Sequence, residues 1–306
     1  SIGVQDQEGI LKNSNLQRYS ARLNLNQEAL DGRLKIAYNF TGAQTKNLRP
    51  DMGSIVVDML QLNPTIPALT NGQPTPLEDM LNPLVRYDIY KDEAVNNRIL
   101  ANVTPSIELI KGLTYKLNLG VDYSTTTRDI QTEPYALLEG SELGSLTSIA
   151  KRNENSLVEN TLTYVLESGS HSATILGGHS YQRTFEHQKS FSLTGFADND
   201  VEPIYQDQIS TQEQPTTLNS FAVENELQSF FGRLDYSFES KYLLTATMRA
   251  DGSSKFGKNN KYGYFPSFAA GWNITQESFF SGGLIDNLKL RASWGQTGNQ
   301  EIPSKI

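Results

Sequence analysis

The chain has 306 residues, a net charge of −8 and no cysteine. Its isoelectric point is near 5.0 and its mean hydropathy is −0.45. The acidic balance argues against a nucleic-acid partner, and the lack of thiols excludes disulfide scaffolds and thiolate metal sites. No stretch approaches the ~18 consecutive apolar residues of a membrane-spanning helix. The length fits either one large β domain or two small domains.

Apolar and polar residues alternate in the segment LTYKLNLGVDYS, residues 113–124. Its odd-numbered positions are apolar, and its even-numbered positions are polar or glycine. Successive side chains of a strand point to opposite faces, so the segment predicts a strand with one apolar and one polar face. The same alternation recurs at 18–25, 33–41, 98–109, 158–166, 171–182, 230–238, 242–250, 264–274 and 288–294. We therefore expect an all-β protein.

Short and long connections alternate between these segments. Short turns are expected at 27–32, 110–112, 167–171 and 238–241, with a somewhat longer one at 275–287. Long polar connections are expected at 42–97, 124–157, 183–226 and 251–263, the first of which contains a proline-rich extended loop at 62–76. This order predicts an antiparallel up-and-down meander with its short turns at one end and its long loops at the other.

Two architectures fit the alternation. A soluble sandwich or propeller would cover the apolar face with a second sheet, whereas a transmembrane barrel would turn it toward lipid around a polar lumen. Strands of about 9–12 residues favour the barrel, as do aromatic residues near strand ends. Those aromatic residues are Tyr19, Tyr123, Tyr242, Tyr264, Trp272 and Trp294. The polar positions also carry charges suited to a watery lumen, and the candidate lumen-lining residues are Arg22, Lys116, Arg233, Asp235, Arg249 and Arg291.

Glycine and proline mark special backbone positions near the strand ends. Gly252 and Gly257 are expected to adopt positive φ angles, which bulky residues avoid. Pro105 and Pro266 lie inside strand segments, where proline removes a ladder donor, so each predicts a bulge or a rim position.

The residues give no sign of catalytic chemistry or of a cofactor. Motifs for nucleophilic serine, zinc-protease or nucleotide sites do not occur. His171, His179 and His187 share one parity but are eight residues apart, about 27 Å along a strand, which is too far for a shared metal. An acidic loop containing Asp198, Asp200 and Glu202 is read as solvated, with calcium as the alternative. Aromatic residues in or beside long loops could stack on sugars or pack within the loops, and they are Tyr87, Tyr90, Phe185, Phe191, Phe196 and Tyr205.

Several segments resemble the SusC/RagA family of TonB-dependent outer-membrane transporters. The most specific are FGRLDY (231–236), KYLLTATMRADGSSKFG (241–257), YGYFPSFAAGW (262–272) and LKLRASWGQTGNQ (288–300). Residues 6–26, 82–90 and 111–124 resemble family barrel segments less specifically.

The resemblance implies that residues 1–306 form one partial barrel domain, truncated at both ends. It would be about half of a 22-strand transmembrane barrel, roughly 10–11 strands, without the plug domain. The implied location is the outer membrane of a Gram-negative, Bacteroidetes-like bacterium, crossed several times by strands. An open half-barrel leaves two unpaired edges, so we do not expect it to be stable alone.

The implied function is import of oligosaccharides or peptides, energised through TonB, with no enzymatic step. The implied partners are a SusD-like surface lipoprotein, outer-membrane lipid, the substrate, and the TonB–ExbB–ExbD complex, which would act through an absent N-terminal region. The alternative is a soluble or surface-anchored β-rich binding module without transport activity. A secreted β-propeller enzyme fits less well, because blade repeats and catalytic motifs are both missing.

Overall fold

A computed structural model describes residues 1–77, 80–135, 143–196, 217–257, 259–280, 285–299 and residue 302. Within these residues, eleven strands form one antiparallel sheet in chain order, β1-β2-β3-β6-β7-β8-β9-β10-β11-β12-β13. The strands are β1 (Ile2–Glu8), β2 (Asn15–Ala29), β3 (Leu34–Arg49), β6 (Tyr90–Ile110), β7 (Leu113–Thr132), β8 (Gly144–Ser168), β9 (His171–Phe196), β10 (Thr217–Phe238), β11 (Tyr242–Ser253), β12 (Tyr262–Asn273) and β13 (Lys289–Gly295). Each strand of this sheet pairs with the next strand of the same sheet along the chain, so the predicted meander is confirmed.

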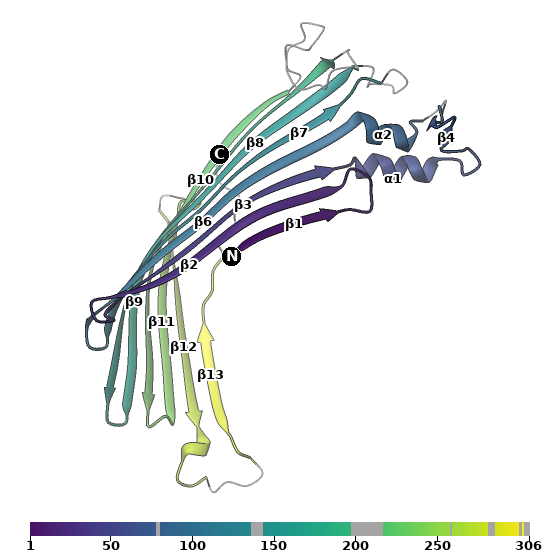
Figure 1. Ribbon diagram of the computed structural model, residues 1–306. Helices are drawn as coiled ribbons and strands as arrows, with labels where there is room; N and C mark the ends of the chain where they lie inside the picture. Colours follow the sequence, from purple (N-terminus) through teal and green to yellow (C-terminus); the bar gives the residue numbers. More distant parts are fainter. Residues whose placement is uncertain are drawn as a thin grey trace.

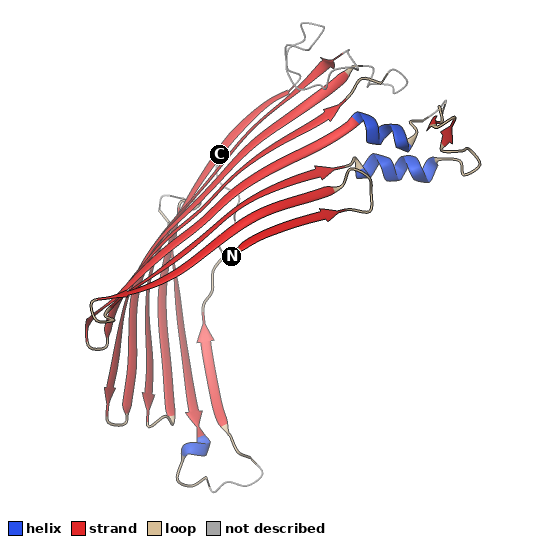
Figure 2. Ribbon diagram, viewed as in Figure 1, coloured by secondary structure: helices blue, strands red, loops and turns tan. Residues whose placement is uncertain are grey.

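The sheet is a single, strongly curved layer that does not close on itself (Figure 1). Figure 2 shows no second sheet packed against either side of it. Among the described residues, the buried apolar clusters are small and lie near the long-connection end, and they consist of Leu81, Val85 and Ile89, and of Leu146, Leu193 and Phe196. The arrangement is therefore an open, partial barrel, and the sandwich alternative is excluded for the described part of the chain.

The short turns lie at one end of the sheet and the long connections at the other, as predicted (Figure 1). Residues with positive φ angles make the tight turns, including Gly32 after β2, Gly112 after β6 and Gly169 after β8. Gly112 must be a glycine for a second reason, since a Cβ there would lie 2.6 Å from the Val165 carbonyl oxygen. These turns let consecutive strands pair directly.

The strands are much longer than the alternation predicted. β8 has 25 residues, β9 has 26 and β10 has 22. Most of residues 144–157, 183–196 and 217–226 was expected to be loop, and these residues extend the ladders instead. The expectation was wrong because both faces of the sheet are polar in this region, which removes the alternating signal without removing backbone pairing.

The connection between β3 and β6 contains two α-helices, α1 (Met52–Gln61) and α2 (Pro83–Ile89). Asp51 caps α1 by accepting a hydrogen bond from the Ser54 amide, and Asn82 caps α2 with Pro83 in its first turn, both favoured arrangements. The proline-rich segment between the helices was predicted as an extended loop. It includes the short hairpin β4 (Leu69–Thr70) and β5 (Gln73–Pro74). Neither helix in the described residues has the length and apolar content needed to cross a bilayer.

Two expectations about special residues were wrong. Pro105 and Pro266 cause no register shift, and the irregularity between β6 and β7 lies at Glu108 and Ile110. Gly252 and Gly257 do not adopt positive φ angles. Gly252 instead allows the Tyr262 ring to approach closely, since a Cβ at this position would lie 2.6 Å from ring carbons.

Candidate functional site

The ladder register assigns each strand residue to one of two faces, because directly paired residues lie on the same face. Leu119 on β7 pairs with Val103 on β6 and with Val158 on β8. Continuing the pairs in both directions defines the apolar face. Its members include Leu23, Leu25, Phe40, Val103, Leu119, Val158, Leu162, Ile175, Leu234, Leu244, Phe268 and Leu290.

The apolar face is accessible along its whole width. Leu119 is 41% exposed, Leu244 44% and Leu290 61%, and Leu117 is half-buried by its neighbours in the sheet. All six predicted girdle residues also lie on this face, with Tyr242 and Trp272 directly paired at the short-turn end. A continuous apolar surface of this kind is the lipid-facing signature of a transmembrane barrel.

The six candidate lumen residues all lie on the opposite side, which we call the polar face. The register places Arg22 on β2, Lys116 on β7, Arg233 and Asp235 on β10, Arg249 on β11 and Arg291 on β13, each on the face opposite to that of Leu119. They are spread over five strands and do not form one cluster. That these residues line a lumen stays a prediction.

Ion pairs recur on the polar face. Arg233 and Arg249 each bind a carboxylate two residues ahead, with closest distances of 2.6 Å to Asp235 and 2.7 Å to Asp251. Further pairs join adjacent strands β6 and β7, namely Arg98 with Asp122 at 2.5 Å and Arg128 with Asp92 at 2.6 Å. Such paired charges keep the face hydrophilic while limiting its net charge.

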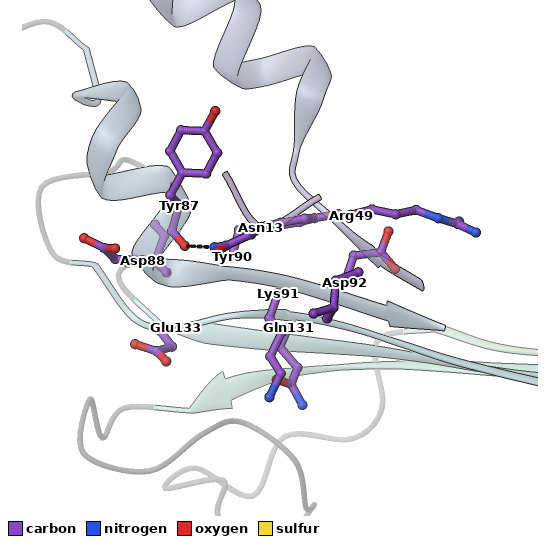
Figure 3. A pocket seen from close by; sticks show the side chains of 11 residues that line it. Asn13, Arg49, Tyr87, Asp88, Tyr90, Lys91, Asp92, Gln131 and Glu133 are labelled. Carbon is purple, nitrogen blue, oxygen red and sulfur yellow. Dashed lines mark hydrogen bonds between the residues drawn. The ribbon is translucent and has the colours of Figure 1, made fainter. Parts of the chain in front are cut away.

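A pocket of about 310 Å³ lies at the long-connection end, where the β1–β2 loop reaches α2 (Figure 3). The Asn13 side chain donates a hydrogen bond of 2.9 Å to the Tyr87 carbonyl oxygen, and Lys12 lies 3.6 Å from Asp88. Tyr87 and Tyr90, two of the predicted loop aromatics, both line this pocket. The sequence could not predict the pocket, because its walls come from residues about 120 positions apart.

A second pocket, of about 370 Å³, opens on the polar face at the long-connection end of β11 and β12. Its wall includes Arg249, Asp251, Phe256, Asn260, Phe265 and Asn299. The DGSSKFG and YFPS segments supply Asp251, Phe256 and Phe265 of this wall. Sequence reasoning assigned no binding role to these three residues.

Other residues that the sequence singled out lie apart from both pockets. His171, His179 and His187 all belong to β9, so the placement of His187 in a loop was wrong. Phe185, Phe191 and Phe196 also belong to β9, and the Arg152 guanidinium lies 5.1 Å from the Phe185 ring centre. Tyr205 and the acidic segment with Asp198, Asp200 and Glu202 fall outside the described residues. In the part of the chain that is described, no three His, Asp or Glu side chains are placed to hold a metal.

The matching family model is described as TonB dependent receptor-like, beta-barrel, and it covers residues 60–301. The chain belongs to this family. The resemblance to SusC/RagA transporters is thereby confirmed, and so is the expected position of the chain in a multi-pass β-barrel of the outer membrane.

Among relatives, the TonB-dependent receptor P3 of Formosa agariphila is 33% identical over 312 residues, which cover 97% of this chain and 31% of that protein. The TonB-dependent receptor SusC of Bacteroides thetaiotaomicron is 29% identical, covering 99% of this chain and 32% of SusC. Among solved structures, the RagAB peptide transporter matches with a TM-score of 0.84 and 26% identity over 98% of this chain and 35% of that one. The chain thus spans about a third of the length of these relatives.

Proposed function

We propose that the complete protein imports a nutrient across the outer membrane and that this chain supplies part of the barrel wall. The observation that carries the proposal is the division of one eleven-stranded layer into an accessible apolar face and a charged polar face. A wall of this kind seals against lipid on one side and presents a hydrated surface to a polar solute on the other. The relatives of this chain are named as TonB-dependent receptors, and a similar solved structure is named as a peptide transporter.

The proposed cargo is an oligosaccharide or a peptide. Lining residues on the polar face would include Arg22, Lys116, Arg233, Arg249 and Arg291. They offer hydrogen-bond donors and fixed charges but no catalytic constellation, so import would involve binding and passage without a covalent step. One relative is named as a peptide transporter, which supports peptides as one of the two classes.

Energy for import would come from TonB with ExbB and ExbD, and a SusD-like surface lipoprotein would cooperate in capturing substrate. Family membership supports both partners. The long-connection end, with its helices and two pockets, is the part of this chain where a surface partner and the cargo would meet the wall.

The proposal is tested by deleting the gene for the complete transporter and measuring accumulation of labelled oligosaccharides and peptides by intact cells. We expect accumulation of at least one class to fall to background, to return on complementation, and to be lost equally when the TonB gene is deleted. Unchanged accumulation of both classes, or recovery of the protein in the soluble fraction without detergent, would favour the binding-module alternative.

A further inference from the structure

The pocket at the end of β11 and β12 combines side chains that suit one class of ligand. We propose that it is a binding subsite for a neutral sugar ring of an imported oligosaccharide, an inference that rests on the proposed transport function and narrows its substrate class. Arg249, Asp251 and Asn260 would bind hydroxyl groups, and Phe256 and Phe265 would contact the apolar face of the ring.

The polar part of the subsite is held in a fixed orientation. Arg249 Nε donates to both carboxylate oxygens of Asp251, at 2.7 and 2.9 Å. Its Nη2 donates to the hydroxyl of the fully buried Ser229 at 3.0 Å, and its guanidinium lies 5.6 Å from the Phe231 ring centre. Within the described residues, Arg249 Nη1 has no hydrogen-bond partner, so two N–H groups are available next to acceptor lone pairs of Asp251.

The apolar part is equally well fixed. The Phe265 ring approaches the backbone of two glycines so closely that a Cβ at Gly263 would lie 2.7 Å from it and a Cβ at Gly298 would lie 2.3 Å from it. Phe256 lies in the β11–β12 turn, where its amide donates to the Ser253 carbonyl oxygen at 3.3 Å. Both rings are only half-buried, which leaves aromatic surface for a ligand.

The Arg249–Asp251 pair leaves the polar part of the subsite without net charge. An ionised ligand would therefore gain no net electrostatic attraction from this pair, since its attraction to one member is offset by repulsion from the other. A hydroxyl group both donates and accepts, and neighbouring hydroxyls of a sugar can therefore bridge the donor and acceptor of this pair. Aromatic rings next to a few oriented polar groups are also the usual composition of a small-ligand site.

The test uses the complete transporter, purified in detergent and applied to an array of defined neutral oligosaccharides, acidic oligosaccharides and peptides. We expect neutral oligosaccharides to bind, and Asp251→Asn and Phe256→Leu each to weaken the tightest of them at least tenfold. Phe256 lies in a turn outside the strands, so its replacement leaves the ladder intact. Glu224→Gln is the matched control, because it removes a similar carboxylate that is paired with Arg183 on the side of the sheet opposite to the pocket. This variant should leave affinity unchanged.

The outcomes separate this inference from the broader function. Neutral oligosaccharide binding that is insensitive to both variants would overturn the subsite while leaving sugar import intact. Binding of peptides or acidic glycans alone, or of no array member, would overturn the assignment of neutral sugars. Failure of the cellular accumulation test would instead remove the transport function itself.

Discussion

Asn118 and Leu119 are consecutive residues of β7 that lie on opposite faces of the sheet. Asn118 pairs with Glu159 and Leu119 pairs with Val158 on the neighbouring strand. Asn118 also accepts a hydrogen bond from the Asn102 side chain, whereas Leu119 is 41% exposed among other apolar side chains. The two positions share a strand and nearly the same depth, so they differ chiefly in the face on which each side chain lies.

Arginine at these two positions should therefore have unequal effects in the complete transporter. Leu119→Arg places a guanidinium against lipid and should destabilise the barrel by about 2–4 kcal/mol. Asn118→Arg forfeits neutral hydrogen bonds worth about 1 kcal/mol but keeps the new charge in water. Refolding into lipid vesicles followed by urea titration would measure both. Equal losses would show that the assignment of faces is wrong.

Gly178 and Gly177 provide a second matched pair. A Cβ at Gly178 would lie 2.4 Å from carbon atoms of the Phe231 ring, while a Cβ at Gly177 would meet nothing within 4 Å. Gly178→Ala must displace Phe231 and the Arg249 guanidinium next to it, so we expect a loss of about 1–3 kcal/mol. Gly177→Ala should be neutral or slightly stabilising, because it reduces the entropy of the unfolded chain. The same urea titration checks both, and a loss at Gly177 as large as at Gly178 would contradict the packing argument.

The sequence predicted the two faces and the order of the strands well. Where one face is apolar and the other polar, the side chains alternate with a period of two. The register places all the candidate lumen residues, from Arg22 to Arg291, on the polar face, and their lining of a lumen stays a prediction. Strand lengths were underestimated because, toward the long-connection end of the sheet, both faces carry polar residues. Residues such as Asn153 and Thr184 then look like loop although they continue the ladder.

The pockets were beyond sequence reasoning for a different reason. Their walls combine segments that are distant in the sequence. These segments lie together because of the strand register and because of contacts made beyond the alternating strand segments. The DGSSKFG motif drew attention to its glycines as turn residues, yet Gly252 and Gly263 serve close approach of the Tyr262 and Phe265 rings. A glycine directly opposite an aromatic residue across a ladder, such as Gly252 opposite Tyr262, was the signal that could have shown this.

The orientation of α1 against α2 should depend on Arg86, which lies 3.5 Å from Asp51, the N-cap residue of α1. Arg86 Nε lies 2.7 Å from Asp58, and both side chains are less than a fifth exposed. Arg86→Met leaves the Asp58 carboxylate without its partner, which in buried settings costs about 3–5 kcal/mol. We expect amide hydrogen exchange in α1 to accelerate strongly while exchange in β7 stays unchanged.

Lys12→Met is the control for that experiment. It removes the pair between Lys12 and Asp88, whose side chains are 67% and 64% exposed, and such pairs contribute at most about 1 kcal/mol. Exchange in α1 should stay close to that of the native protein. Slow exchange in α1 of the Arg86→Met variant would mean that apolar packing, including the fully buried Ile55, holds the helix by itself.

Glu277 should make the short-turn end of the sheet sensitive to acid. Glu277 directly follows the 3-10 helix Ile274–Gln276. Its Oε1 atom accepts hydrogen bonds of 2.6 Å from the Tyr242 hydroxyl and 3.0 Å from Trp272 Nε1. The hydrogen bond from Tyr242, then that from Trp272, holds the pKa of the Glu277 carboxyl below its usual value. Because the pKa is lower in the folded protein, the resulting stability is present above the unfolded pKa and disappears as pH falls through the folded one.

Glu277→Gln separates that charge effect from the geometry, because the amide oxygen of glutamine can still accept from Tyr242 and Trp272. The native protein should lose stability at this end when pH falls from 7 toward 3, and the variant should lose less over the same range. The measurement is amide exchange of β12 and of the segment 274–280 at each pH, compared with β7 as an internal reference. The variant should also be less stable than the native protein near pH 7, since a neutral acceptor binds these donors more weakly than a carboxylate. Parallel pH profiles for the two proteins would show that the turn is held by Trp272 packing against Phe279 and that the Glu277 charge contributes nothing measurable.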